Sequence, residues 1–252
     1  MIPDLTGSIE TTDNCAAAVT VTQLPAASTT MASEDGMTHN VTIIATDGAG
    51  NVSTCLITLT GQDETDPVIT TDCSTLATDV DLTASCEMVI PDLTGSIATT
   101  DNCAAAVTVS QSPTAATAVA SADGMTHDVT ITATDGAGNT TTCTVTLTGQ
   151  DVTDPVITTD CSTLAEDIDL TASCEIVIPD LTGSIATTDN CAAAVTVSQS
   201  PTAATAVTSA DGMTHDVTIT ATDGAGNTTT CTVTLTGQDV TCLLYTSPSP
   251  RD

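Results

Sequence analysis

Hydrophobic residues and threonines alternate along much of this chain. Along residues 129–134 Val, Ile and Ala alternate with Thr, and along residues 143–148 Cys, Val and Leu do the same. A period of two residues predicts strands that bury one face and expose the other. No stretch has helical periodicity, so the pattern predicts an all-β fold.

Turn-forming residues separate these alternating runs. The segment 135–139, Asp-Gly-Ala-Gly-Asn, has the glycines and asparagine that suit a hairpin turn. We expect further strands from Val107 onward, as one continuous run over residues 80–90, and at residues 67–69, where the proline suits an edge strand. Six or seven short strands in 88 residues predict an antiparallel β-sandwich of the immunoglobulin-like type.

The whole pattern recurs with a period of 88 residues. Residues 89–153 and 177–241 differ at one position, Ala120 against Thr208. A period of this size is too long for a solenoid turn and suits a small domain. We therefore expect tandem immunoglobulin-like antiparallel β-sandwich domains arranged as beads on a string: a first repeat, truncated at its N-terminus, over 1–62, a second over 63–150 and a third over 151–241. Met1 has the register position of Val89, within a repeat, so we interpret the chain as an internal piece of a longer protein.

The segment 242–252 breaks the pattern. It holds the chain's one aromatic residue, Tyr245, and its one basic residue, Arg251. Its codons can be written to match the transposase end and adapter of a tagmentation sequencing library. We therefore interpret 242–252 as an adapter-derived artefact and leave it out of the fold prediction.

Charge narrows the choice of partners. Residues 1–241 contain 31 Asp and Glu, which is the chain total of 32 without Asp252, and no Lys or Arg. Such a surface repels phosphate backbones and anionic head groups, so we expect no nucleic-acid binding and no direct membrane insertion. It attracts cations instead, divalent ones above all. Disorder is the competing interpretation of this composition, and the periodic placement of aliphatic residues argues against it.

Ten cysteines keep register with the repeats: Cys15, Cys55, Cys73, Cys86, Cys103, Cys143, Cys161, Cys174, Cys191 and Cys231. They share the parity of inward-facing residues, so we expect them to be buried. The cysteines lack C-x-x-C spacing and histidines are few, so the sequence does not indicate a zinc site. It indicates disulfides in an extracellular or cell-surface protein. Four cysteines allow three pairings. The expected sandwich topology favours 73–86 and 103–143, with copies 161–174, 191–231 and 15–55.

Acidic side chains gather at one expected end of each domain. They come from the incoming linker, from an Asp-Asn loop and from the hairpin turn. Carboxylate and amide oxygens from three segments suit Ca²⁺, which takes 6–8 oxygen ligands. The expected ligands are Asp63, Asp66, Asp101, Asn102, Asp135, Asp151, Asp154, Asp189, Asn190 and Asp223. The alternative is that these residues cap turns and keep an acidic surface solvated.

Several of these motifs together resemble a known module. Asp-Pro-Val-Ile at 66–69, Thr-Asp-Asn-Cys at 100–103 and the Ala-Thr-Asp-Gly-Ala-Gly-Asn hairpin ending at Asn139, followed by Cys143, resemble the hyalin repeat (HYR). That module is similar to immunoglobulin-like domains and occurs in tandem in extracellular adhesive and matrix proteins. The resemblance covers essentially all of residues 1–241 and implies a structural or adhesive role.

The functional prediction is a non-enzymatic array, a stalk or adhesion segment of a larger secreted or surface protein whose partner is an unknown extracellular protein or glycan. A catalytic set copied nearly unchanged along the chain is not expected, and no serine lies in a Gly-x-Ser-x-Gly context. Two alternatives remain open: glycan- or protein-binding accessory modules of a secreted enzyme or receptor, and a surface-layer or matrix protein. Residues 1–241 lack the aromatic platforms that glycan sites generally need.

Overall fold

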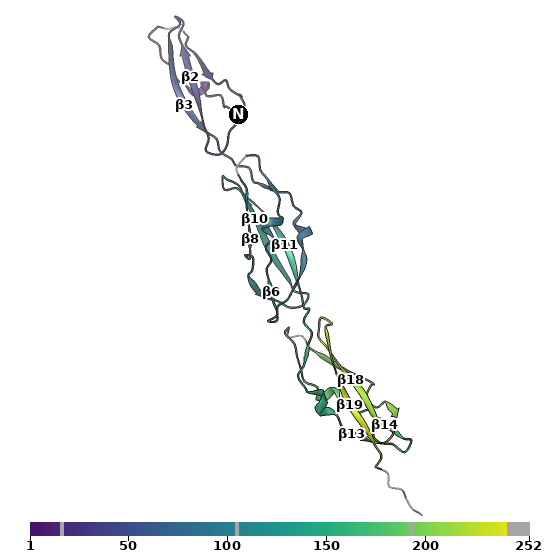
Figure 1. Cartoon of the computed structure of the whole chain (residues 1–252). Helices are drawn as coiled ribbons and strands as arrows, with labels where there is room; N and C mark the ends of the chain where they lie inside the picture. Colours follow the sequence, from purple (N-terminus) through teal and green to yellow (C-terminus); the bar gives the residue numbers. More distant parts are fainter. Residues whose placement is uncertain (16–17, 104–105, 192–193, 241–252) are drawn as a thin grey trace, which may run out of the picture. The chain divides into compact units, whose positions relative to one another are not determined.

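The computed structural model describes residues 1–15, 18–103, 106–191 and 194–240 (Figure 1). The segment interpreted above as an artefact lies outside the described residues. The chain divides into two compact units, one of Met1–Ala77, Pro91–Ala115 and Asp128–Thr146, and one of Thr78–Ile90, Ala116–His127 and Leu147–Asp252. Strands and short 3-10 turns make up the regular structure of the described residues, and none of their helices is long and apolar enough to span a bilayer. The all-β prediction is confirmed.

The first unit contains a three-stranded antiparallel sheet in the order β1-β2-β3. These strands are Thr20–Leu24, Thr38–Thr46 and Val52–Thr60. Val41 and Ile43 of β2 form a small buried core together with Ile2. The unit also holds two antiparallel ladders of the second repeat, β4 (Val68–Ile69) with β7 (Thr99–Thr100) and β8 (Thr108–Ser112) with β10 (Thr126–Thr134).

The second unit contains a four-stranded sheet in the order β13-β19-β18-β16. Two short ladders, β12-β15 and β14-β17, accompany this sheet. Their bounds are Val156–Ile157 (β12), Asp167–Asp169 (β13), Glu175–Val177 (β14), Thr187–Thr188 (β15), Thr196–Ser200 (β16), Ala206–Thr208 (β17), Thr214–Thr222 (β18) and Thr228–Gln238 (β19). The second repeat has the same order, β5-β11-β10-β8, and its central strands β10 and β11 (Thr140–Gln150) contribute residues to both units.

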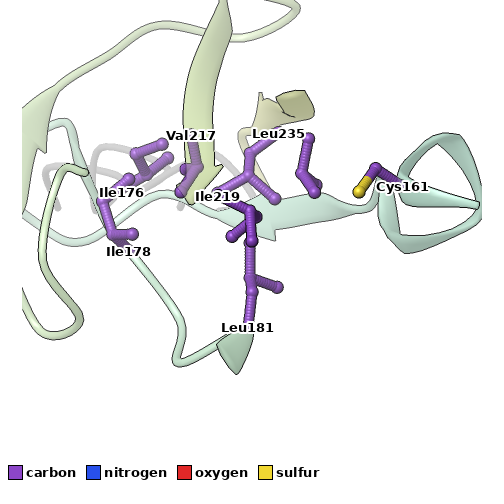
Figure 2. Close-up of a cluster of buried hydrophobic side chains, with 8 residues drawn as sticks. Cys161, Ile176, Ile178, Leu181, Val217, Ile219 and Leu235 are labelled. Carbon is purple, nitrogen blue, oxygen red and sulfur yellow. The ribbon is translucent and has the colours of Figure 1, made fainter. Parts of the chain in front are cut away.

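The core of the third repeat is a cluster of buried side chains from the four-stranded sheet and from the short ladders (Figure 2). Val217 and Ile219 of β18 and Leu235 of β19 meet Ile176 of β14, and all four are fully buried. Threonines take the intervening positions of β18, where the burial pattern alternates as the sequence predicts. The second and third repeats are therefore tandem β-sandwich domains with small aliphatic cores.

The continuous strand expected over residues 80–90 is wrong. The segment forms two strands, β5 (Thr78–Asp81) and β6 (Glu87–Val89), which belong to different sheets. Between them the Thr83 hydroxyl accepts the Glu87 N–H at 3.2 Å, and Cys86 has a positive φ of 54°. This turn moves the chain from one sheet to the other. One pairing in each of the second and third repeats also departs from the antiparallel prediction, because β5 runs parallel to β11 and β13 runs parallel to β19.

The predicted disulfide pairing is wrong as well. Cys73 is bonded to Cys143, and its copy Cys161 to Cys231, while Cys86 is bonded to Cys191 of the next repeat. Inward parity could not apply to Cys86, because this residue lies in the turn between β5 and β6 and not on a strand. The expectation of burial also fails at three of the free cysteines, since Cys15, Cys55 and Cys174 are exposed and Cys103 is half-buried.

Candidate metal centres

Within the part of the chain that the structure describes, two groups of side chains could hold a metal ion. One lies at the start of the second repeat and the other at the start of the third. The first joins Asp63, Asp101 and Cys103, and the second joins Asp151, Asp189 and Asp223. Within each group the ligand atoms all lie within 4.8 Å of one another. The three segments named by the sequence, which are the linker, the Asp-Asn loop and the hairpin turn, therefore meet at the second group.

Backbone turns place the three carboxylates of the second group. Asp223 opens the hairpin between β18 and β19, and its Oδ1 accepts the N–H groups of Gly226 and Asn227 at 2.7 and 2.8 Å. Asp189 caps its own loop through Oδ2, which accepts the Cys191 N–H at 3.0 Å. Asp151 begins the linker and accepts the Thr153 N–H at 3.1 Å. Each carboxylate is thus held by donors of its own segment.

Two oxygen atoms at this group are buried without a hydrogen-bond donor. Asp189 Oδ1 and Asn190 Oδ1 are buried and have no hydrogen-bond donor. The Asn190 amide nitrogen donates to the Thr83 carbonyl at 3.2 Å and to Asp151 Oδ1 of the group at 3.4 Å. Asp101 Oδ1 is buried without a partner in the same way in the first group. Buried oxygens usually have a donor or an ion, and carboxylate and amide oxygens are the ligands Ca²⁺ takes, so this donor set fits the cation.

The negative charge of the second group also favours a cation. Asp151 and Asp223 are buried, with 4% and 6% of their surface exposed. Residues 1–241 contain no Lys or Arg to neutralise them. Carboxylates this close repel each other, and the repulsion grows where water is excluded. Burial acts to raise the pKa of Asp223, but the hydrogen bonds donated within its own turn outweigh burial and keep that pKa below its ordinary value. Asp223 therefore stays ionised near neutral pH.

The first group differs because it contains a thiol. The Asp63 carboxylate accepts the Thr65 N–H and the Asn102 amide at 3.1 and 3.2 Å, and these bonds together with the Cys103 thiol lower its pKa. The same Asp63 contact, burial and the nearby charges of Asp101 and Glu34 raise the pKa of Cys103 to about 11. Cys103 is thus a protonated donor here, and not a thiolate ligand. The predicted ligand Asp135 is buried in its hairpin turn but is not a member of this group.

Asparagine side chains fasten the linkers to the hairpins. Asn139 Nδ2 donates to the carbonyls of Asp63 and Thr65, both at 3.2 Å. Its copy Asn227 donates to the Asp151 carbonyl at 3.0 Å. The sequence analysis identified this hairpin asparagine as a turn former and missed its tertiary role.

The sequence analysis also missed a hydrogen bond at each linker, in which an aspartate of the preceding repeat accepts the N–H of the first aspartate of the linker. Asp35 accepts the Asp63 N–H at 3.0 Å, and Asp123 accepts the Asp151 N–H at 3.0 Å. The 28-residue spacing of these pairs recurs in every copy and was the available signal. Asp66 and Asp154, by contrast, are exposed and lie outside both groups. Asn102 is also exposed and contributes its amide donor to Asp63.

Comparisons with known proteins give distant structural likenesses. No family model matches the chain, so the hyalin-repeat resemblance stays a prediction, and no curated protein matches it either. Among solved structures, the protocadherin GammaB4 extracellular domain is similar at 17% identity and a TM-score of 0.36, covering 81% of this chain and 37% of that one. Drosophila N-cadherin EC1-4 is similar at 10% identity and a TM-score of 0.36, covering 82% and 59%. Human CDH23 EC21-23 is similar at 14% identity and a TM-score of 0.34, covering 79% and 73%. The function proposed below rests on the chain's own residues.

Proposed function

We propose that this chain is a non-enzymatic structural array, a stalk or adhesion segment of a larger secreted or surface protein, whose repeat junctions bind Ca²⁺. The observation that carries the proposal is the second acidic group. Ligand atoms of three carboxylates, from the linker, loop and hairpin, lie within 4.8 Å of one another, and Asp189 Oδ1 and Asn190 Oδ1 are buried without a donor. A divalent cation supplies the missing positive charge and accepts those oxygens as ligands.

Repetition supports a mechanical role over a catalytic one. The linker, loop and hairpin return with the 88-residue period, and the first group repeats most of the second. A site that recurs at successive domain junctions acts on how the domains are held together. Ca²⁺ that joins the linker to the following domain restricts the linker and stiffens the array.

The disulfides support a location outside the reducing cytosol. The described residues contain three disulfides, Cys73–Cys143, Cys86–Cys191 and Cys161–Cys231, and these cysteines do not have the spacing of a metal-binding motif. Such bonds persist in oxidising compartments. We therefore propose an extracellular or cell-surface location, with an extracellular protein or glycan as the partner.

Calcium binding is tested on the full chain by isothermal titration calorimetry after treatment with a chelator. We expect two binding events per chain and a thermal midpoint that rises with Ca²⁺, because binding to the folded state adds about 2.7 kcal/mol at a hundredfold excess over Kd. Asp189→Asn should leave one event. This substitution removes a charge and keeps an acceptor for the Cys191 N–H.

Asp154→Asn is the matched control, because Asp154 is exposed and outside the group. It should retain both events and the full thermal shift. Equal loss in Asp154→Asn and Asp189→Asn, or no heat and no thermal shift in the wild-type chain at millimolar Ca²⁺, would contradict the metal site.

Stiffening is tested separately by small-angle X-ray scattering. We expect a larger maximum dimension in millimolar Ca²⁺ than in chelator, because bound cations remove repulsion and restrict the linkers. Asp189→Asn should reduce this difference. Calcium binding with an unchanged scattering profile would retain the site and reject the mechanical role.

A further inference from the structure

Three observed bonds follow one rule when the cysteines are numbered by their order within the 88-residue repeat. The first cysteine of a repeat is bonded to the fourth of the same repeat, as in Cys73–Cys143 and Cys161–Cys231. The second is bonded to the third of the next repeat, as in Cys86–Cys191. Among the residues that the structure describes, the free cysteines are Cys15, Cys55, Cys103 and Cys174. Each is a position whose partner under this rule falls outside residues 1–252.

The surroundings of Cys103 preserve the place of a partner sulfur. A cavity of about 380 Å³ lies against Cys103, and Met1, Ser33 and Asp63 are among its lining residues. At the bonded junction Cys86 Sγ lies 3.5 Å from the Ser121 carbonyl. Ser33 is the copy of Ser121 in the first repeat. The cavity at Cys103 therefore occupies the place that the Cys86 sulfur takes at the next junction.

A histidine at the same cavity also differs from its copies in the second and third repeats. His127 Nε2 is hydrogen-bonded to Ser121 Oγ at 3.0 Å, and its copy His215 to Ser209 Oγ at 2.9 Å. His39 lines the cavity at Cys103, and its Nε2 is buried with no partner. Ser33 instead turns its hydroxyl to the Glu34 carbonyl at 3.4 Å. The serine–histidine contact thus accompanies a chain segment that carries the second cysteine.

Cys174 has the conformation of the bonded Cys86. Their φ angles are 56° and 54°. Cys174 N–H donates to the Thr171 carbonyl at 2.9 Å, as Cys86 N–H does to Thr83 at 2.8 Å. The Cys174 carbonyl accepts the Ser209 N–H at 3.0 Å, as the Cys86 carbonyl accepts the Ser121 N–H at 3.2 Å. The backbone at the free, exposed Cys174 therefore has the conformation that it has at the bonded Cys86.

We propose that Cys103 and Cys174 are the two half-sites of a recurring inter-repeat disulfide, and that each bonds to a cysteine of a further copy of this repeat. Cys103 takes the second cysteine of a preceding copy, and Cys174 takes the third cysteine of a following copy. The partner copy belongs either to the same polypeptide or to a second chain. Every junction is then crossed by one covalent bond, whether or not a cation is present.

The bond forms by thiol–disulfide exchange with a small-molecule disulfide as oxidant. The thiolate of the incoming cysteine attacks the small disulfide, giving a mixed disulfide and releasing one small thiol. Cys103 loses its proton, attacks the protein sulfur of the mixed disulfide and releases the second small thiol. Two protein thiols are oxidised by two electrons, and one small disulfide is reduced to two thiols.

The Cys103 half-site is tested by placing Cys-Glu-Met directly before Met1, because these three residues precede Val89 in the second repeat. The matched control carries Ser-Glu-Met. Both full chains are equilibrated in a glutathione redox buffer, alkylated, cleaved with an Asp-specific protease and mapped without reduction. We expect the added cysteine to be bonded to Cys103, with loss of Cys103 alkylation in the Cys variant alone. The Cys86–Cys191 bond in the same digest reports correct folding.

Two outcomes would overturn the proposal at this half-site. One is equal alkylation of Cys103 in both variants with Cys86–Cys191 intact. The other is a bond from the added cysteine to Cys15 or Cys55. The calcium titration described above does not depend on either result, so the two proposals fail separately.

The Cys174 half-site is tested by inserting a second copy of residues 151–238 after Gln238, with serine at the copied position of Cys174, so that every Cys174 peptide in the digest comes from the original position. We expect Cys174 to lose its alkylation and to be bonded to the inserted copy of Cys191. A matched insert with serine also at the copied position of Cys191 should leave Cys174 alkylated. A free Cys174 in the cysteine-bearing insert, with Cys161–Cys231 intact, would overturn the rule at this end.

Discussion

At the scale of single residues, neutral donors hold the carboxylates of this chain. Asp92 Oδ1 accepts both the N–H and the hydroxyl of Thr94, at 3.0 and 2.7 Å. These bonds, the hydroxyl first, lower the pKa of Asp92, and the Asp180 pKa is lowered in the same way by Thr182. Hydrogen bonds to the ionised form favour that form. In residues 1–241, which have no Lys or Arg, threonine and serine hydroxyls do what basic side chains do elsewhere.

Thr94→Val should raise the pKa of Asp92 toward its ordinary value, because the largest cause of the shift is removed. A lowered folded pKa gives stability that is present above about pH 4 and lost as the pH falls through the folded value. The variant should therefore lose less stability on acidification than the wild-type chain. A ¹³C-carboxyl NMR titration measures the shift, with Asp180 as the internal control. Unchanged titration of Asp92 in the variant would contradict this account.

At the scale of elements, disulfides tie two of the 3-10 turns, η2 (Cys73–Leu76) and η4 (Cys161–Leu164), to the strands β11 and β19. Cys161 opens η4 and is bonded to Cys231 of β19. Cys161 is also a member of the buried cluster of the third repeat (Figure 2). Aliphatic cores without Phe or Trp bury little area, so small domains of this kind need such bonds. The bond thus supplies stability that the core alone does not.

Replacing both Cys161 and Cys231 by alanine should destabilise the third repeat by about 4 kcal/mol in the chain-entropy treatment of its loop, whose sequence separation is 70 residues. Urea unfolding followed by far-UV circular dichroism should show one transition moved to lower urea. The matched control replaces Cys15 and Cys55, which are free and exposed, and should leave the transitions in place. A control that shifts as far as the test variant would refute the assignment of stability to the Cys161–Cys231 bond.

At the scale of the whole molecule, charge is the dominant property. The formal net charge is −31 at pH 7. Uncompensated charge of one sign destabilises a folded state through self-repulsion. Mobile ions weaken this repulsion, because the Debye length falls from about 30 Å at 0.01 M to about 3 Å at 1 M salt. We therefore expect the folded chain to be more stable at high salt than at low salt.

Raising NaCl from about 0.01 M to 1 M should increase the thermal midpoint of the chelator-treated chain. Most of the increase should come below a few tenths molar, where screening changes fastest. KCl at equal ionic strength is the control for ion-specific effects and should give the same curve. A thermal midpoint that stays flat or falls with added salt would show that self-repulsion does not limit stability.

The sequence by itself determined what depends on neighbouring residues. Alternation of aliphatic residues with threonine located β10 and β11, and Asp-Gly-Ala-Gly-Asn located the hairpin in which Asp135 accepts the N–H groups of residues 137, 138 and 139. These features arise from contacts within a few residues or from one face of a strand meeting a core. The 88-residue period determined that they recur, and ligand atoms of Asp151, Asp189 and Asp223, from the linker, loop and hairpin, lie within 4.8 Å of one another.

The tertiary structure alone decided which distant groups touch. Parity could not show that the turn at Thr83 breaks residues 80–90 and turns Cys86 toward the next repeat, because the side chains of that segment have a strand's alternation on either side of the turn. Sequence clustering likewise could not separate Asp151, which the Asn227 amide holds through its carbonyl, from the exposed Asp154 three residues later. Disulfides and ion sites depend on distances of a few ångströms between segments. Those distances are set by how the sheets and linkers pack, which a pattern along one chain does not contain.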